Sequence, residues 1–166
     1  MSQRPQLFVN QGRGRFEPEP GAGPYFERRV VGRGAAAGDL NNDGRVDLVV
    51  VHRDAPAAVL LNRTGTGHWL GLRMRGAKSG PNPVGTRVTY RVGGRTATRW
   101  VTTGTSYLAA GDPRLWLGLG PAAAVEHLEV RWPSGLVQSW SGLPADAYLD
   151  LDEGHDPVRR GSTRNP

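Results

Sequence analysis

The chain has 166 residues, a formal net charge of +6, 24 glycines, 13 prolines and no cysteine. The lack of cysteine excludes disulfides, thiolate metal sites and cysteine nucleophiles. The glycines and prolines, which separate short apolar runs, exclude a helical bundle and favour short strands joined by turns.

The positive charge comes almost entirely from arginine, since Lys78 is the only lysine. Such an excess is compatible with a nucleic-acid partner, but a binding footprint would gather its basic residues together. The arginines form no run longer than two, so we favour a compositional bias and expect no nucleic-acid partner. No apolar stretch is long enough to span a membrane, and the start of the chain lacks the apolar segment of a signal peptide.

The first part of the chain predicts short strands interrupted by loops. A strand over residues 7–10, a glycine turn and a second strand near Phe16 come first. After a loop-like stretch and an acidic segment, the β-branched run 48–51 predicts a buried strand, which ends before Pro56.

An internal repeat links the two ends of this part. Asn10 and Asn62 each follow a pair of apolar residues and precede a Gly-x-Gly, and they lie 52 residues apart, close to the length of a propeller blade. The copy that ends at Asn62 carries an acidic segment upstream, whereas the spacing before Asn10 would place that segment ahead of residue 1. We therefore expect a repeat shortened at its start, in a fragment of a longer protein.

From residue 68 the pattern changes to regular alternation of apolar and polar residues. Alternating segments begin at Leu70, Val88 and Leu128, and Gly93-Gly94 predicts a two-residue hairpin turn. Half-buried strands joined by tight turns are typical of a small antiparallel β-sandwich or partial barrel. The polar residues 154–166 predict a disordered tail.

The acidic loop, residues 39–47, is the strongest candidate for a binding site. Asp39, Asn41, Asp43, Arg45 and Asp47 occupy its positions 1, 3, 5, 7 and 9. Alternate oxygen-bearing side chains converge if the backbone curls, and Ca²⁺ takes about six to eight oxygen ligands. A divalent cation also relieves the repulsion among three carboxylates in one short segment. Arg45 would contribute only its carbonyl.

Two other interpretations of the acidic loop compete with this one. An EF-hand requires Glu at position 12, which here is Val50, and it requires flanking helices that the sequence does not predict. A solvated turn rich in Asp and Asn, without a metal, is the simpler alternative. We favour a cation site because the whole pattern rarely arises by chance.

The sequence predicts no catalytic residues and no organic cofactor site. The hydroxyl-rich segment 102–107 has no general base close by in sequence, so it predicts a turn or a strand edge. Trp132 alternates with buried positions and is expected in the core, whereas Trp140 is ambiguous. Exposed tryptophans such as Trp100 would suit a carbohydrate-binding module, which is one alternative function, and an accessory domain of an enzyme is another.

Several motifs resemble known families. The segment 7–16 and the acidic loop resemble the FG-GAP/VCBS repeat, and residues 68–153 resemble the ASPIC/UnbV domain of cartilage acidic protein-like proteins. The stretches that carry the second resemblance are Gly85–Val88, Gly104–Leu108, Asp112–Leu115 with Gly118–Gly120, and Val130–Gly135. The expected organisation is all-β: an incomplete propeller blade over residues 1–67, a small sandwich-like domain over 68–153, and the tail.

The resemblance implies a non-enzymatic, calcium-binding interaction or adhesion module of a surface or secreted protein. It implies Ca²⁺ as the cofactor, with Asp39, Asn41, Asp43, the Arg45 carbonyl and Asp47 as ligands. A lone blade would leave an apolar face and a strand edge uncovered. The expected partners are therefore a protein or glycan ligand and, where the blade is incomplete, blades supplied by another chain.

Overall fold

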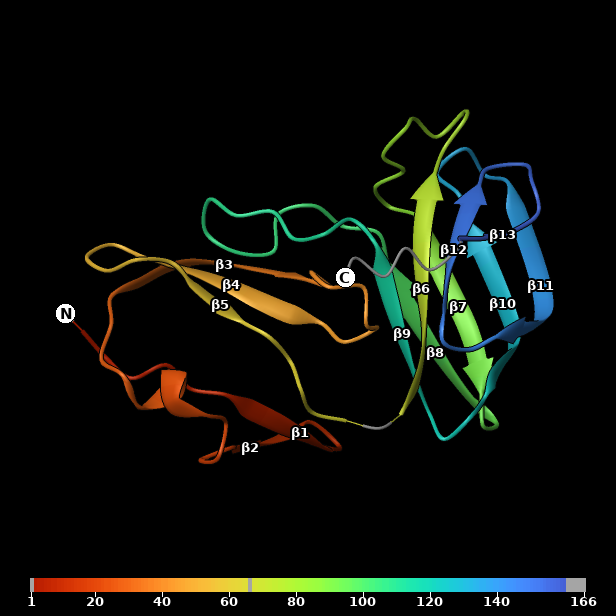
Figure 1. The fold of residues 1–166 in the computed structure, drawn as a ribbon. Coiled ribbons are helices and arrows are strands. Elements are labelled where there is room, and N and C mark those ends of the chain that lie inside the picture. Colours follow the sequence, from red (N-terminus) through yellow and green to blue (C-terminus); the bar gives the residue numbers. More distant parts are fainter. Residues whose placement is uncertain (1, 66, 161–166) are drawn as a thin grey trace.

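The computed structural model describes residues 2–65 and 67–160. The described elements are strands, apart from one short 3-10 helix, η1 (Pro24–Glu27), which confirms the predicted all-β class. Figure 1 shows two groups of strands: β1 to β5, here called the N-terminal region, and β6 to β13, here called the sandwich. Among the described residues, no helix is long and apolar enough to cross a membrane.

The N-terminal region contains two small sheets. A hairpin forms the first and confirms the strand–turn–strand prediction near the start of the chain. The second sheet has the antiparallel order β3-β4-β5, and the acidic loop joins β3 to β4. The strands are β1 (Phe8–Gly12), β2 (Arg15–Pro18), β3 (Gly32–Gly38), β4 (Asp47–His52) and β5 (Ala58–Leu60).

The sandwich contains two four-stranded sheets with the orders β11-β10-β7-β8 and β13-β12-β6-β9. Its strands are β6 (His68–Arg75), β7 (Arg87–Val92), β8 (Arg95–Trp100), β9 (Leu115–Gly120), β10 (Ala124–Arg131), β11 (Val137–Pro144), β12 (Ala147–Asp152) and β13 (Val158–Arg159). The β7–β8 hairpin turns at Gly93-Gly94, both with positive φ, as predicted. The antiparallel prediction is wrong for one pair, since β6 and β12 run parallel. The five strands between them provide the long crossover that a parallel pair requires.

One apolar core lies between the two sheets of the sandwich. The sheet containing β6 and the sheet containing β7 both contribute alternate residues to it. Trp132 also belongs to this core, and its indole N–H donates to Gln138 Oε1 at 2.8 Å. The core residues are Leu70, Leu72, Met74, Val88, Tyr90, Val101, Leu117, Leu119, Val125, Leu128, Val130, Trp132, Ala147, Leu149 and Leu151. The core position predicted for Trp132 is confirmed.

The N-terminal region buries much less apolar surface. Val30 is the only large apolar side chain that is buried among residues 2–65. The prediction of a buried strand over 48–51 is wrong: Leu48, Val49 and Val50 are half-buried, and Val51 is 49% exposed. The reason is that β4 lies in a three-stranded sheet on which Val51 and Val59 are exposed to solvent.

The predicted disordered tail is wrong in part. Val158 and Arg159 form β13, which pairs antiparallel with β12. These residues add an edge strand to the sandwich. Residues 161–166 of the predicted tail lie outside the described part of the chain.

A loop of the sandwich crosses to the N-terminal region and covers the free edge of β3. Asp112 N–H donates to the Ala37 carbonyl at 2.9 Å, and Ala35 N–H donates to Ser106 Oγ at 3.2 Å. Gly34 has no room for a side chain there, because a Cβ would come within 2.7 Å of the Tyr107 carbonyl oxygen. The hydroxyl-rich segment 102–107 thus belongs to a loop that supplies hydrogen-bond partners to the edge of β3.

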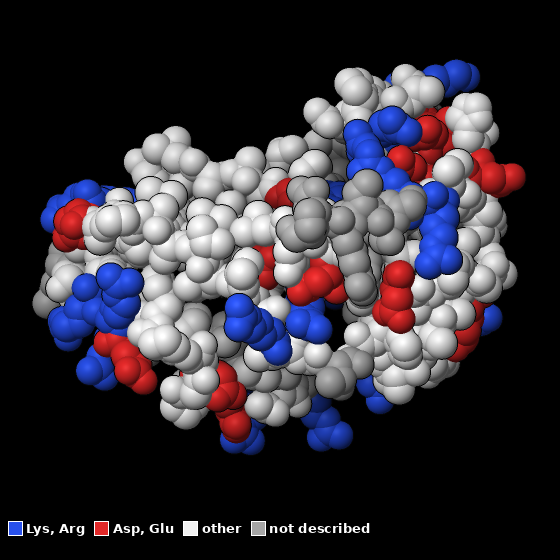
Figure 2. Space-filling model, in the orientation of Figure 1, with Lys and Arg blue, Asp and Glu red and all other residues white. Residues whose placement is uncertain are grey.

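On the face shown in Figure 2, basic side chains are spread over both regions among acidic ones.

Candidate metal site

The acidic loop is the connection of the β3–β4 hairpin. Strands flank it on both sides, as the sequence indicated, and not the helices of an EF-hand. Its turn places Asn42 at φ 57° and Gly44 at φ 86°, in the left-handed region that Asn and Gly tolerate best. The loop therefore curls back on itself within a few residues.

Asp39 accepts three hydrogen bonds and is only 3% exposed. Its Oδ1 accepts the backbone N–H of Asp43 at 3.1 Å, and its Oδ2 accepts the backbone N–H of Gly44 at 2.7 Å. The hydroxyl of Tyr148, which lies on β12 in the sandwich, also donates to Oδ2. The Asp39 carboxylate therefore connects the turn of the acidic loop with Tyr148 of the sandwich.

Asp47 closes the other end of the loop and is 1% exposed. Its Oδ2 accepts the backbone N–H of Leu40 at 3.0 Å, and its Oδ1 accepts the backbone N–H of Asn62 at 2.7 Å. Asp47 thus holds the start of the loop and the chain that follows β5. Asn62 is a position that the sequence singled out, and its backbone N–H makes this contact.

The middle of the acidic loop is more open. Asp43 Oδ2 accepts the side-chain amide of Asn41 at 3.0 Å, and its Oδ1 accepts the backbone N–H of Arg45 at 2.9 Å. The Arg45 guanidinium lies 3.7 Å from Asp43. Both side chains of this ion pair are partly exposed, so the pair contributes little to stability.

The chemistry of this donor set fits a hard cation. The predicted ligands offer only oxygen atoms, which are the ligands that Ca²⁺ takes. An ionised carboxylate has about four lone-pair sites, so Asp39, Asp43 and Asp47 keep acceptor capacity beyond the hydrogen bonds described above. Within the described residues, no group of three acidic or histidine side chains is gathered around one point.

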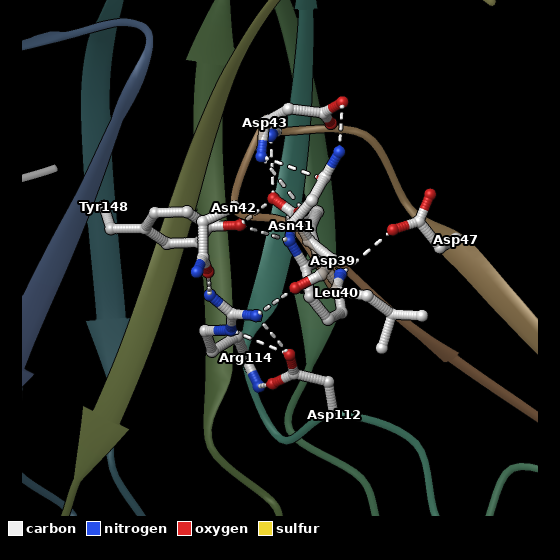
Figure 3. Close-up of polar contacts among 11 residues, drawn as sticks. Asp39, Leu40, Asn41, Asn42, Asp43, Asp47, Asp112, Arg114 and Tyr148 are labelled. Atoms are coloured by element: carbon white, nitrogen blue, oxygen red, sulfur yellow. Dashed lines mark hydrogen bonds and ion pairs between the residues drawn. The ribbon is translucent and has the colours of Figure 1, made fainter. Parts of the chain in front are cut away.

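The sandwich holds the acidic loop through Arg114, the residue directly before β9. Its Nη2 donates to the backbone carbonyl of Asp39 and its Nη1 to Asn42 Oδ1, each at 2.8 Å (Figure 3). Its Nε donates to Asp112 Oδ2, also at 2.8 Å. The guanidinium therefore fixes the first half of the loop, and Asp112 balances its charge.

Aromatic rings complete this contact surface. The Arg114 guanidinium lies 4.5 Å from the ring centre of Tyr148, and Trp116 Nε1 donates to the Tyr148 hydroxyl at 3.3 Å. Burial, and then the hydrogen bond to Asp39, raise the pKa of Tyr148 above its usual value. Tyr148 therefore stays protonated and acts as a donor at neutral pH.

Two glycines permit the close approach. A Cβ on Gly44 would come within 1.9 Å of the Trp69 ring, so the acidic loop lies directly against that indole. A Cβ on Gly71 of β6 would come within 2.2 Å of the Tyr148 ring, which fills the space that Gly71 leaves on the outer face of the sheet. The loop and the sandwich therefore fit together without space for an additional methyl group at either glycine.

Sequence reasoning missed the residues that the sandwich contributes. Arg114 and Tyr148 lie 75 and 109 residues beyond Asp39, and no local spacing connects them with the acidic loop. In the sequence, Asp112 and Arg114 stood out only as part of a stretch that carries the family resemblance. One available signal was Gly71, which interrupts an alternating strand and marks a position where another group comes close.

Trp100 and Trp140 have different environments. Trp100 is 53% exposed, whereas Trp140 packs against the core of the sandwich and its Nε1 donates to Asp156 at 3.0 Å. Trp100 is therefore the better candidate for a stacking platform.

The comparisons with known proteins identify the sandwich. The family model described as ASPIC and UnbV matches residues 76–158, which is half of the chain, so the chain belongs to this family. The match covers most of the sandwich and begins after the acidic loop. A search of curated proteins finds no match.

Proposed function

We propose that this chain is a non-enzymatic calcium-binding interaction module of a surface or secreted protein, with an FG-GAP/VCBS-like repeat preceding its ASPIC/UnbV domain. The observation that supports it most is an acidic loop with an all-oxygen donor set, held at Asp39 and Asp47 by buried contacts. Bound calcium would neutralise the loop carboxylates. The proposed ligands are the side chains of Asp39, Asn41, Asp43 and Asp47 and the carbonyl of Arg45.

Exposed apolar side chains in the N-terminal region support an interaction role. They lie on β1, β2, β5 and their flanks: Leu7, Phe8, Val9, Phe16, Val59 and Leu61. In the described chain β5 pairs only with β4, which leaves its other edge open. Edges of this kind accept further strands. We propose that the partner is a protein that adds β-structure here, as further propeller blades would.

Calcium titration calorimetry on the full chain tests the proposed function. We expect saturable binding to the wild type and a large loss of affinity in Asp43→Ala. Asp54→Ala, which removes an exposed carboxylate outside the acidic loop, serves as the matched control and should bind like the wild type. Wild-type protein that takes up no calcium would refute the proposal.

Arg45→Ala separates the carbonyl role of Arg45 from a role of its side chain. Because only the carbonyl is proposed as a ligand, this variant should retain calcium binding. Loss of the guanidinium 3.7 Å from Asp43 also removes a competing positive charge. Affinity equal to or above that of the wild type is the expected result, and abolished binding would argue against the assigned ligand set.

A second candidate function, carbohydrate binding, is favoured by the exposure of Trp100. Exposed aromatic faces provide stacking platforms for ligands with an apolar face. A glycan array with the wild type and Trp100→Ala distinguishes this candidate. Tryptophan-dependent binding supports it, and an array without any signal opposes it.

A further inference from the structure

We propose that the sandwich sets the cation affinity of the acidic loop, through Tyr148 and Arg114 acting as positioning residues. The candidate site is then built from two regions that are remote in sequence. This inference rests on the proposed calcium function and deepens it. It assigns roles to residues of the ASPIC/UnbV domain, beyond the loop itself.

The first argument concerns the two oxygens of Asp39. Its Oδ2 accepts the Gly44 N–H and the Tyr148 hydroxyl, which fills the two lone pairs of that oxygen. Its Oδ1 accepts only the Asp43 N–H at 3.1 Å and keeps a lone pair. Tyr148 therefore orients the carboxylate so that Oδ1 remains available to a cation. Metal-ligating carboxylates are commonly oriented by such outer hydrogen bonds.

The second argument concerns the backbone of the loop. The Nη2 and Nη1 groups of the planar Arg114 guanidinium donate to the Asp39 carbonyl and to Asn42 Oδ1, respectively. Asn42 is the residue with φ 57° at which the loop curls. Fixing both sides of that curl lowers the conformational entropy that the loop loses when its ligands converge on an ion.

The third argument concerns charge, because a guanidinium close to a cation site would ordinarily repel the ion. Asp112 pairs with Arg114, and the side chains of the pair are only 20% and 16% exposed, so their charges compensate each other in a poorly hydrated environment. Arg114 can therefore hold the acidic loop with little net positive charge. Removal of the Asp112 charge would leave the guanidinium opposed to the cation.

The test compares two tyrosines in the full chain by calcium titration calorimetry. Tyr148→Phe removes only the hydroxyl that reaches Asp39. Tyr107→Phe removes a hydroxyl from a ring that is 66% exposed and serves as the matched control. We expect roughly tenfold to hundredfold weaker binding for Tyr148→Phe, the range found when outer hydrogen bonds to metal ligands are lost, and unchanged binding for Tyr107→Phe.

A second variant, Asp112→Asn, changes charge with almost no change in shape and should also weaken calcium binding. Melting temperatures without calcium are recorded for every variant. A merely structural role would lower those temperatures and leave the affinity of the folded protein unchanged. If Tyr148→Phe fails to fold, Asp112→Asn decides between the two roles.

The outcomes separate the inference from the proposed function. If the wild type binds calcium and neither Tyr148→Phe nor Asp112→Asn alters the affinity, the inference is overturned and the proposed function stands. If the wild type binds no calcium, both are overturned. Weakened binding in these two variants, with Tyr107→Phe unchanged, supports the inference.

Discussion

The two regions of the chain bury different kinds of side chain. In the sandwich the most buried side chains are apolar, and Leu70, Leu72 and Leu128 are inaccessible to solvent. In the N-terminal region the most buried side chains are the carboxylates of Asp39 and Asp47. Apolar burial is the main favourable term in folding. The comparison therefore indicates that the sandwich supplies the stability, and that the N-terminal region is organised by its acidic loop and by contacts with the sandwich.

The largest expected effect is a core truncation in the sandwich. Leu128→Ala removes buried methyl groups and leaves a cavity, so it should cost about 2–5 kcal/mol of unfolding free energy. Val50→Ala on the half-buried β4 should cost less, roughly 1 kcal/mol. Denaturant unfolding measures both values. Equal losses would show that the two regions are stabilised in the same way.

Next in size is a substitution at the contact between the two regions. Gly44→Ala introduces strain at φ 86° and a clash with Trp69, and should cost roughly 1–3 kcal/mol. Gly12→Ala is the matched control, since it has φ 85° but open space around it, and should cost no more than about 1 kcal/mol. The difference in unfolding free energy measures the contact with Trp69. No difference would mean that the acidic loop does not rest on this ring.

A smaller and pH-dependent effect is expected at Glu153, which directly follows β12. Its carboxylate accepts hydrogen bonds from Ser134 and from the backbone N–H groups of Ala77 and Ser79, at 2.7 and 2.8 Å. Burial alone would raise the pKa of Glu153, but these donors lower it from 4.5 to about 2.

Because the folded-state pKa of Glu153 is depressed, its contribution to stability is present above pH 4.5 and is lost as the pH falls toward about 2. Glu153→Gln should remove that part of the acid dependence and destabilise the sandwich at neutral pH. Urea unfolding of both proteins across this pH range measures the effect. Identical pH profiles for the wild type and the variant would refute the assignment.

The smallest effect is expected on the exposed face of the N-terminal region. Val51→Ser changes a side chain that is 49% exposed, and should alter the unfolding free energy by no more than about 0.5 kcal/mol. A large loss in the isolated chain would show that this face is covered, for example by a second copy. Sedimentation analysis of the same samples would identify such a copy.

Local patterns in the sequence were sufficient to predict much of the fold. Alternation in β6, β7 and β10 identified the apolar core, and Gly93-Gly94 identified the hairpin turn. The parallel pairing of β6 with β12 could not be predicted, because pairing across a long crossover leaves no local pattern. The exposure of Val51 was missed because a β-branched run does not reveal whether a second layer covers it.

The candidate site shows the same limit. Asp39 and Asp47 were identified because their spacing is local, and the structure shows that both are buried at the ends of one hairpin loop. Arg114 and Tyr148 were not identified, because they lie 75 and 109 residues beyond Asp39 in the sequence. The hydrogen bonds from the sandwich to the acidic loop arise from tertiary packing, which the spacing of residues along the sequence does not reveal.

Thermal unfolding of the full chain, with and without millimolar Ca²⁺, tests most directly the claim that the acidic loop binds calcium. The wild type and Asp43→Ala are compared. A ligand that binds only the folded state raises the melting temperature by mass action. We predict that calcium raises the melting temperature of the wild type and leaves that of Asp43→Ala unchanged. Cooperative melting of both proteins at temperatures that calcium does not change would contradict the claim.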